Sequence, residues 1–199
     1  MILYGNLNSG NCYKVRLLLS YLGVAYTYEN MDAPNGATRT PEFLAINPAG
    51  QIPVLVLNDG RTLAESNAIM TFLAEDTPYV PVNAFDRAKA LQWMFWEQYK
   101  HEPAIAVARF ISYYAPDREG ELPNLHERGR AALDVMEGHL QTSPWFAGSG
   151  PSVADIALYA YTHVAEDGGF KLADYPHVQA WCERMAEHPK HVLMTDMPA

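Results

Sequence analysis

The sequence is poor in the features that mark several common classes of protein. It has only two cysteines in 199 residues, Cys12 and Cys182, and because they fall in different helical patterns they predict no disulfide framework. It contains no long uninterrupted hydrophobic run and no basic segment of the kind that opens a signal peptide, so we expect neither a membrane span nor secretion. Together these absences predict a reducing, cytoplasmic setting.

Positive charge is also scarce. Lys and Arg number 14 against 23 Asp and Glu, which gives a formal net charge of −9 at pH 7. Nucleic acids and anionic membranes attract proteins through Lys and Arg, so this balance argues against both as main partners.

Signatures of metal, nucleotide and hydrolase sites are missing as well. No zinc or iron site is expected, because no regular metal-ligand spacing connects His101, His126, His139 and His163. The chain has no Gly-rich phosphate loop and no G-x-S-x-G turn, which argues against nucleotide-dependent and hydrolase activities.

The first 75 residues predict the element order β-α-β-α-β-β-α. Strand patterns lie at residues 1–4, 25–29, 54–57 and 61–63. The first helical pattern ends at Gly23, the second begins at Pro41 and the third opens after Glu65. Because a crossover helix separates the first two strands, we expect them to be parallel, whereas the last two form an antiparallel hairpin around Asn58-Asp59-Gly60.

Residues 76–83 predict a linker, since Pro78 and Pro81 lie there without hydrophobic periodicity. From residue 84 onward only helical patterns follow. Pro103 is expected to kink or divide the first long helix. A later helix opens at Ser152, with Asp155 in the position of a capping box. The chain thus predicts an α/β domain followed by an all-helical one.

Two segments of the first domain could bind a small peptide with a free amino acid end. Pro53 precedes the buried third strand, where it predicts a bend, plausibly through a cis peptide bond, that leaves the Ile52 backbone facing outward to pair with an extended ligand. Glu65-Ser66 opens a helix whose first amides attract a carboxylate, while the Glu65 side chain attracts an ammonium. The same residues also fit an ordinary strand, turn and capped helix.

The segment Ser9-Gly10-Asn11-Cys12 lies where the first strand passes into the first helix. There a Ser9 hydroxyl can donate to a thiolate, which the helix dipole also stabilises, or Ser9 or Asn11 can simply cap the helix. Cys12 fits either a low-pKa nucleophile or a small buried residue. Since Ser9 stands where a C-x-x-C protein has its first cysteine, this segment cannot close an internal disulfide.

Large aromatic side chains are concentrated around the long helix after the linker. Too many occur there to fit one buried stripe, so we expect some in the core and others at an apolar pocket or subunit contact. The set comprises Trp93, Phe95, Trp96, Tyr99, Phe110, Tyr113 and Tyr114.

The element order and a series of motifs, spread over nearly the whole chain, resemble those of the cytosolic glutathione transferases. The motifs are Thr40-Pro41-Glu42-Phe43-Leu44, Asn47-Pro48-Ala49-Gly50-Gln51-Ile52-Pro53-Val54-Leu55, Leu63-Ala64-Glu65-Ser66-Asn67-Ala68-Ile69 and Ser152-Val153-Ala154-Asp155-Ile156. The resemblance implies a thioredoxin-like glutathione-binding domain at 1–75 and an all-helical electrophile-binding domain at 84–199, in a homodimer. It also implies that glutathione is the co-substrate.

The resemblance assigns further roles by position. Pro53 is similar to the family's cis-proline, and Ile52 to the residue whose backbone pairs with the cysteinyl part of glutathione. Glu65 and Ser66 are similar to the anchors of the γ-glutamyl end.

Gln51 corresponds to a position near the glycine end of glutathione, and Arg39 could help to neutralise that carboxylate. Ser9 matches the serine that activates the thiol in theta-like and related bacterial members, and in the expected mechanism Asn11 and the helix amides assist it. The residues themselves leave open whether Ser9, Asn11 or Cys12 activates the thiol. Tyr4 lies within the first strand and is expected to be structural.

The expected function is therefore conjugation of the glutathione thiolate to small hydrophobic electrophiles, as in detoxification. Two alternatives are a glutathione-dependent disulfide or peroxide reductase, in which Cys12 could form a mixed disulfide, and a non-catalytic interaction protein of the same fold.

Overall fold

The computed structural model describes residues 1–198, which divide into two compact units. The first unit comprises residues 1–75 together with the C-terminal segment from Pro189, and the second spans Asp76–His188. The sequence alone had placed the C-terminal segment with the helical half. It belongs to the first unit because side chains of the first helix hold it: the Tyr13 hydroxyl donates to the Val192 carbonyl at 2.7 Å, and Arg16 Nη1 donates to the Met194 carbonyl at 2.9 Å.

A four-stranded mixed sheet forms the centre of the first unit. Its strands are β1 (Ile2–Gly5), β2 (Thr27–Asn30), β3 (Val54–Val56) and β4 (Thr62–Ala64). The order across the sheet is β2-β1-β3-β4, with β2 parallel to β1 and both β1–β3 and β3–β4 antiparallel. This confirms the predicted strand order and directions.

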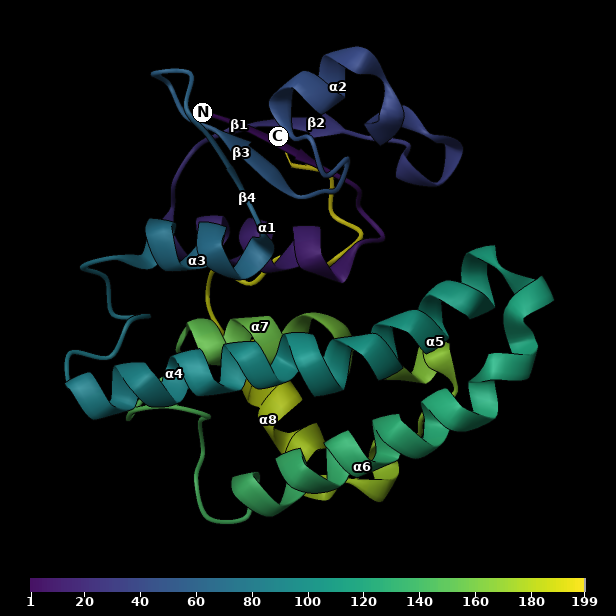
Figure 1. Ribbon diagram of the computed structural model, residues 1–199. Helices are drawn as coiled ribbons and strands as arrows, with labels where there is room; N and C mark the ends of the chain where they lie inside the picture. The colour runs from purple at the N-terminus through teal and green to yellow at the C-terminus, as the bar shows by residue number, and fades with distance from the viewer. Residues whose placement is uncertain (199) are drawn as a thin grey trace. The chain divides into compact units, whose positions relative to one another are not determined.

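Three α-helices cover the two faces of this sheet. They are α1 (Gly10–Leu22), α2 (Pro41–Ile46) and α3 (Ser66–Ala74). Figure 1 shows α1 and α3 on one face and α2 on the other. Two short 3-10 turns, η1 (Ala33–Asn35) and η2 (Ala37–Arg39), connect β2 to α2. The core between the layers is apolar, with Leu3, Leu55, Leu18 and Ile69 all fully buried.

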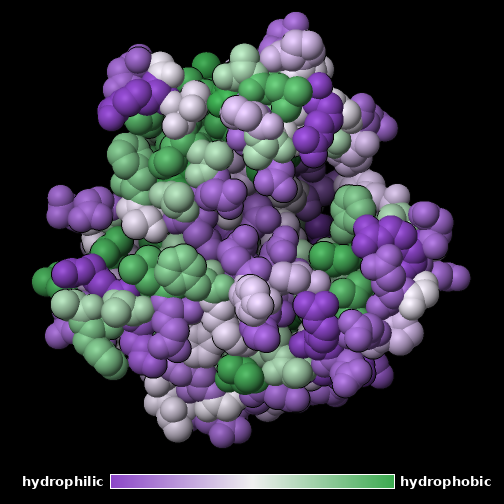
Figure 2. All heavy atoms as spheres, viewed as in Figure 1, coloured by the Kyte–Doolittle hydropathy of each residue, from purple (hydrophilic) through white to green (hydrophobic). Residues whose placement is uncertain are grey.

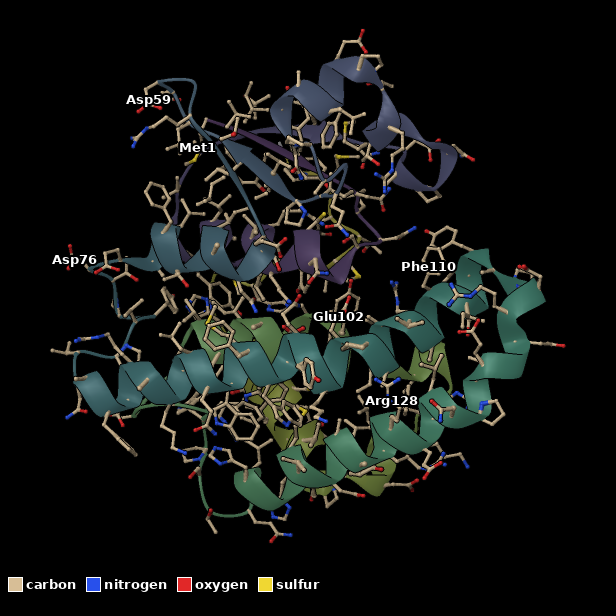
Figure 3. All side chains as sticks on the ribbon, viewed as in Figure 1. Met1, Asp59, Asp76, Glu102, Phe110 and Arg128 are labelled. Carbon is tan, nitrogen blue, oxygen red and sulfur yellow. The ribbon has the colours of Figure 1, made fainter. Side chains whose placement is uncertain are left out.

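Glycine and proline mark the ends of these elements as the sequence predicted. Gly23 caps α1 in the left-handed region, at φ 68°, and Pro41 lies in the first turn of α2 behind a Thr40 cap. The β3–β4 turn contains Asp59, labelled in Figure 3, whose carboxylate accepts from the Arg61 amide and pairs with its guanidinium at 2.8 Å.

Helices alone make up the second unit (Figure 1). They are α4 (Ala84–Trp96), the π-helical turn η3 (Glu97–His101), α5 (Glu102–Tyr114), the 3-10 turn η4 (Pro116–Glu121), α6 (Leu122–Leu140), α7 (Val153–Thr162), the 3-10 turns η5 (Ala165–Gly168) and η6 (Leu172–Asp174), and α8 (Pro176–Ala186). The long aromatic helix is interrupted just before Pro103, by η3. Pro103 itself lies in the first turn of α5, where its missing amide hydrogen costs little.

The start of α7 confirms the predicted capping box. The Asp155 carboxylate is fully buried and accepts from the Ser152 amide at 2.9 Å, the Phe146 amide at 3.0 Å and Trp181 Nε1 at 3.1 Å. The Asp155 side chain therefore links three parts of the unit, which are the loop before α7, the first turn of α7, and helix α8.

Candidate functional site

Ser9 is the N-cap of α1. Its backbone is extended, at φ −85° and ψ 118°, and its Oγ accepts a hydrogen bond from the Cys12 amide at 3.3 Å. The hydroxyl keeps its own hydrogen for donation while Oγ accepts this bond. The capping role and a donor role toward a bound anion are thus compatible in the same side chain.

Asn11 connects the starts of α1 and α3. Its Oδ1 accepts from Lys14 Nζ at 2.8 Å and from the Ser66 hydroxyl at 3.3 Å. Ser66 is buried in the first turn of α3. Of the predicted site residues, the structure therefore joins Ser9, Asn11 and Ser66 at two neighbouring helix N-termini.

Cys12 lies behind this turn rather than at its surface. Its side chain is 0% exposed, and burial raises the pKa of its thiol to about 11. The Ser9 hydroxyl, the Asn6 backbone and the positive charges of Arg16 and Lys14 oppose this rise without cancelling it. At neutral pH the thiol is protonated. Burial likewise raises the pKa of Cys182, and both cysteines are free thiols.

The peptide bond between Ile52 and Pro53 is cis, as the sequence suggested. Pro53 is buried at the start of β3, and Ile52 is partly exposed. Within residues 1–198, neither the amide nor the carbonyl of Ile52 takes part in a backbone hydrogen bond. The carbonyl of the preceding residue, Gln51, accepts from Asn47 Nδ2 at 2.8 Å.

The Glu65 backbone adopts a conformation that side-chain-bearing residues rarely take. With φ 67° and ψ 111° it forms the N-cap of α3, yet its side chain makes no capping hydrogen bond. The Glu65 side chain is exposed, and the Glu65 backbone carbonyl accepts from the Ile69 amide at 2.9 Å. Such strain is often found where a backbone is held for ligand contact.

Arg39 is placed close to the loop that carries Gln51. Its Nη1 donates to the Ala49 carbonyl at 3.2 Å, and its guanidinium lies against Gly50, where a Cβ atom would approach Nη1 to 2.5 Å. Gly50 has a φ of 62°, and a Cβ atom there would also lie 3.0 Å from the Thr38 carbonyl oxygen, so the backbone favours glycine at this position.

Two polar residues that support the site were not assigned to it from the sequence. Lys14 reaches Asn11 from the next turn of α1, and Asn47 holds the loop before Pro53 through Ala49 and Gln51. Asn47-Pro48 is a turn signal that could have been recognised. Nothing in the local pattern of α1 distinguishes Lys14 from an exposed helical lysine.

The aromatic set of the second unit is divided as expected between core and surface. Trp93 is 7% exposed and packs edge-on against Trp96, whereas Phe95 and Tyr99 are 72% and 76% exposed. A groove of about 670 Å³ lies along η3 and α6, lined by Trp96, Tyr99, Lys100, Pro103, Arg128, Ala131, Ala132 and Val135. Figure 3 shows Arg128 on the side of α6 that faces α5.

Family models of known proteins match parts of both units. The family model of the glutathione S-transferase N-terminal domain matches residues 8–76, and that of the C-terminal domain matches residues 95–189. The chain belongs to the glutathione S-transferase family. The expected combination of a thioredoxin-like N-terminal domain and an all-helical glutathione transferase C-terminal domain is therefore confirmed.

Three relatives of this glutathione S-transferase chain differ in their described roles. The disulfide-bond oxidoreductase YfcG of Escherichia coli K12 is 32% identical over 90% of this chain and 87% of its own. A glutathione S-transferase from Pseudomonas fluorescens Pf-5 has a TM-score of 0.95 and 52% identity over 98% of both chains. A maleylacetoacetate isomerase from Methylobacterium extorquens AM1, with bound malonate and GSH (glutathione), has a TM-score of 0.81 and 29% identity over 94% and 92% of the two chains.

Two structural features are absent from residues 1–198. No helix there is both long enough and apolar enough to cross a bilayer. No group of three or more His, Cys, Asp or Glu side chains in that range is arranged to hold a metal ion.

Proposed function

We propose that this protein binds glutathione as a co-substrate and conjugates its thiolate to small hydrophobic electrophiles. The observation that supports this most is the arrangement at the first turn of α1, where the Ser9 hydroxyl and the Asn11 side chain, bonded to Ser66, lie at two helix N-termini. Helix N-termini and hydroxyl donors both favour an anion, and a thiolate is the anion this reaction needs.

Three parts of the first unit fit the three parts of the tripeptide. The α3 start, with Glu65 and Ser66, offers a carboxylate for the ammonium and amides for the carboxylate of the γ-glutamyl end. Ile52, whose amide and carbonyl take part in no backbone hydrogen bond within residues 1–198, offers strand-like pairing to the cysteinyl part. Gln51 and Arg39 offer an amide and a cation to the glycine carboxylate. The glutathione-bound relative from Methylobacterium extorquens supports glutathione as the ligand.

In the proposed mechanism, the residues that bind glutathione differ from those that activate its thiol. Ser9 donates to the sulfur, and the α1 dipole and Asn11 add to the stabilisation of the thiolate. Lowering a thiol pKa by two units requires about 2.7 kcal/mol. One hydrogen bond to a charged group contributes about 1.5 to 3 kcal/mol, so Ser9 with the helix dipole is sufficient.

In the reaction the thiol proton leaves to solvent when glutathione binds. The thiolate then forms a C–S bond with the electrophile. The displaced electron pair leaves with the halide of a halogenated aromatic, or stays on the opened epoxide oxygen or the isothiocyanate nitrogen, which then takes up a proton. Binding both reactants converts this encounter into an intramolecular one. We place the electrophile against the helices of the second unit and the glutathione site within residues 1–75.

We exclude Cys12 from the nucleophile role in this proposal. A thiol that is fully buried, with its pKa raised to about 11, supplies almost no thiolate at neutral pH.

The conjugation proposal is tested by assaying the purified protein with glutathione and a panel of halogenated aromatics, epoxides and isothiocyanates. We expect turnover with at least one class, together with a rise in KM for glutathione in Glu65→Ala. Lack of turnover with every class, in a protein that still binds glutathione, would contradict conjugation.

Disulfide reduction is the second candidate, favoured by the relative named as a disulfide-bond oxidoreductase. The same thiolate would attack a disulfide, form a mixed disulfide and release a thiolate, and a second glutathione would complete the reduction. Mixed disulfides and peroxides in the assay panel distinguish this activity from conjugation. Failure of the protein to bind immobilised glutathione would instead favour a non-catalytic interaction protein.

We also propose a cytoplasmic homodimer. Exposed apolar side chains gather on α4, where Phe85, Leu91 and Phe95 are all exposed, and Figure 2 shows hydrophobic surface over the region where Figure 1 draws α4. Light scattering after gel filtration should give twice the 22.2 kDa chain mass. A monomer at micromolar concentration would contradict the dimer.

A further inference from the structure

Lys14 is a fully buried cation beside the proposed thiol site. Its side chain is 0% exposed, which is rare for lysine and requires a good hydrogen-bonding partner. One such partner is Asn11 Oδ1, 2.8 Å from Lys14 Nζ, across one turn of α1. The Lys14 ammonium is thus held inside the protein in contact with Asn11. Asn11 is the residue that the proposed function places next to the glutathione sulfur.

This contact decides the orientation of the Asn11 amide. Lysine Nζ can only donate hydrogen bonds, so the Asn11 atom facing it must be the oxygen. The Ser66 hydroxyl donates to the same oxygen at 3.3 Å from the start of α3. Because the two ends of a planar amide point in different directions, the NH2 end is turned away from these two donors.

We propose that Lys14 is a positioning residue: its buried ammonium fixes the Asn11 side chain so that the NH2 end is presented as a donor to the glutathione sulfur. This inference rests on the proposed function and adds to it a residue that never touches the ligand. If a neutral side chain without a donor replaced Lys14, only the longer bond from Ser66, at 3.3 Å, would still hold the Asn11 oxygen. The amide would then turn more readily and bring its oxygen toward the thiolate, which repels an acceptor.

The other charged and titratable groups around this turn have different roles. On α1, Arg16 donates to the carbonyls of Met194 and Asp196 and so holds the C-terminal segment. Cys12 is buried and protonated, and its thiol already responds to the Lys14 charge, which lowers its pKa. Glu65 lies at the start of α3, and Tyr28 on β2 lies against the Arg16 guanidinium.

The test measures the pKa of glutathione bound to the enzyme, from the ultraviolet absorbance of the thiolate during a pH titration. Lys14→Met should raise this pKa by about one unit, while the glutathione Kd measured at acidic pH, where the bound thiol is protonated, changes less than about threefold. The control Lys171→Met removes an exposed positive charge from the helical unit and should leave the pKa unchanged.

A double-mutant comparison isolates the route through Asn11. In an Asn11→Ala background, Lys14→Met should add almost no further shift, because the side chain it positions is gone. An equal shift in both backgrounds would overturn the proposal, since it would mean that Lys14 acts by its charge alone. An unchanged pKa in Lys14→Met would overturn it as well.

Two outcomes keep this inference separate from the proposed function. If the wild-type protein takes up no glutathione, the proposed function fails before Lys14 is tested. If it binds glutathione with a lowered thiol pKa that Lys14→Met does not alter, only the inference fails. Should Lys14→Met not fold, as judged by circular dichroism, Lys14→Leu, which also lacks a hydrogen-bond donor, replaces it in both backgrounds. The criterion is the same: the pKa shift must depend on Asn11.

Discussion

At the scale of single residues, Ser9 has two roles. It caps α1 through the Cys12 amide, and in the proposed mechanism it donates to the glutathione sulfur. Ser9→Ala removes both, so we expect a loss of about 1 kcal/mol in the free energy of unfolding and a rise of about one to two units in the pKa of bound glutathione. Urea denaturation and thiolate absorbance measure the two effects.

The matched control for Ser9 is Ser9→Thr, which keeps a hydroxyl and a good N-cap. It should retain most of the stability and most of the pKa depression. A bound-thiol pKa that stays unchanged in Ser9→Ala would instead assign activation to Asn11 or to the backbone amides of α1.

Cys12 provides a second residue-scale prediction. Because its thiol is buried and protonated at neutral pH, Cys12→Ala should leave every glutathione-dependent activity within about twofold of wild type. An aromatic disulfide reagent at pH 8 should label it only in urea. Rapid labelling of the folded protein, or loss of disulfide reduction alone in Cys12→Ala, would show that Cys12 has a chemical role.

At the scale of elements, the capping box of α7 concentrates several interactions on one carboxylate. Asp155→Ala leaves the buried amides of Phe146 and Ser152 and the Trp181 indole without their acceptor. We expect a loss of about 3 to 5 kcal/mol in the free energy of unfolding, measured by urea denaturation. Asp134→Ala, on the exposed face of α6, should change it by less than about 0.5 kcal/mol. Similar losses in both variants would contradict the special role of Asp155.

The elements of the first unit were predictable because their boundaries are set by local chemistry. Gly23, Pro41 and the Asn58-Asp59-Gly60 turn act within a few residues of themselves, so their positions in the sequence locate the ends of α1, α2 and β3. The π-helical turn Glu97–His101 was not predictable in this way. Pro103 signalled an interruption, but the packing around α4 and α5, which no local pattern reveals, decides where the extra residue is inserted.

The candidate site was predicted in part for the same reason. Ser9, Ile52, Pro53, Glu65 and Ser66 lie in motifs with a recognisable turn or cap. Whether Cys12 is exposed depends on how α1 packs against its surroundings, and the bonds from Lys14 and Ser66 to Asn11 depend on bringing α1 and α3 together. These features depend on tertiary contacts, which local sequence patterns do not reveal. The sequence therefore did not decide between a buried and an exposed Cys12 or predict the bonds to Asn11.

At the scale of the whole molecule, burial of titratable groups predicts how stability depends on alkaline pH. The Cys12 pKa rises from 9.0 to about 11 on folding, and burial also raises the pKa of Cys182, Tyr28 and Tyr159. A raised pKa means that the folded state holds the proton more tightly. The contribution of the buried Cys12 thiol to the free energy of unfolding is therefore complete below about pH 9 and is lost as the pH rises through 11.

We therefore expect the urea midpoint to fall between pH 9 and pH 11, with Cys12 alone accounting for roughly 2 kcal/mol. Cys12→Ala should show a smaller fall over the same interval. A midpoint that stays constant to pH 11 would contradict the burial of these groups.

Calorimetric titration of glutathione into the purified protein tests the central claim most directly. We predict one binding site per chain, with affinity reduced about tenfold to a hundredfold in Glu65→Ala, which corresponds to about 1.5 to 3 kcal/mol for a hydrogen bond to a charged group. Folded protein that gives no heat with glutathione at any temperature tested, or that binds equally well in Glu65→Ala, would contradict the account.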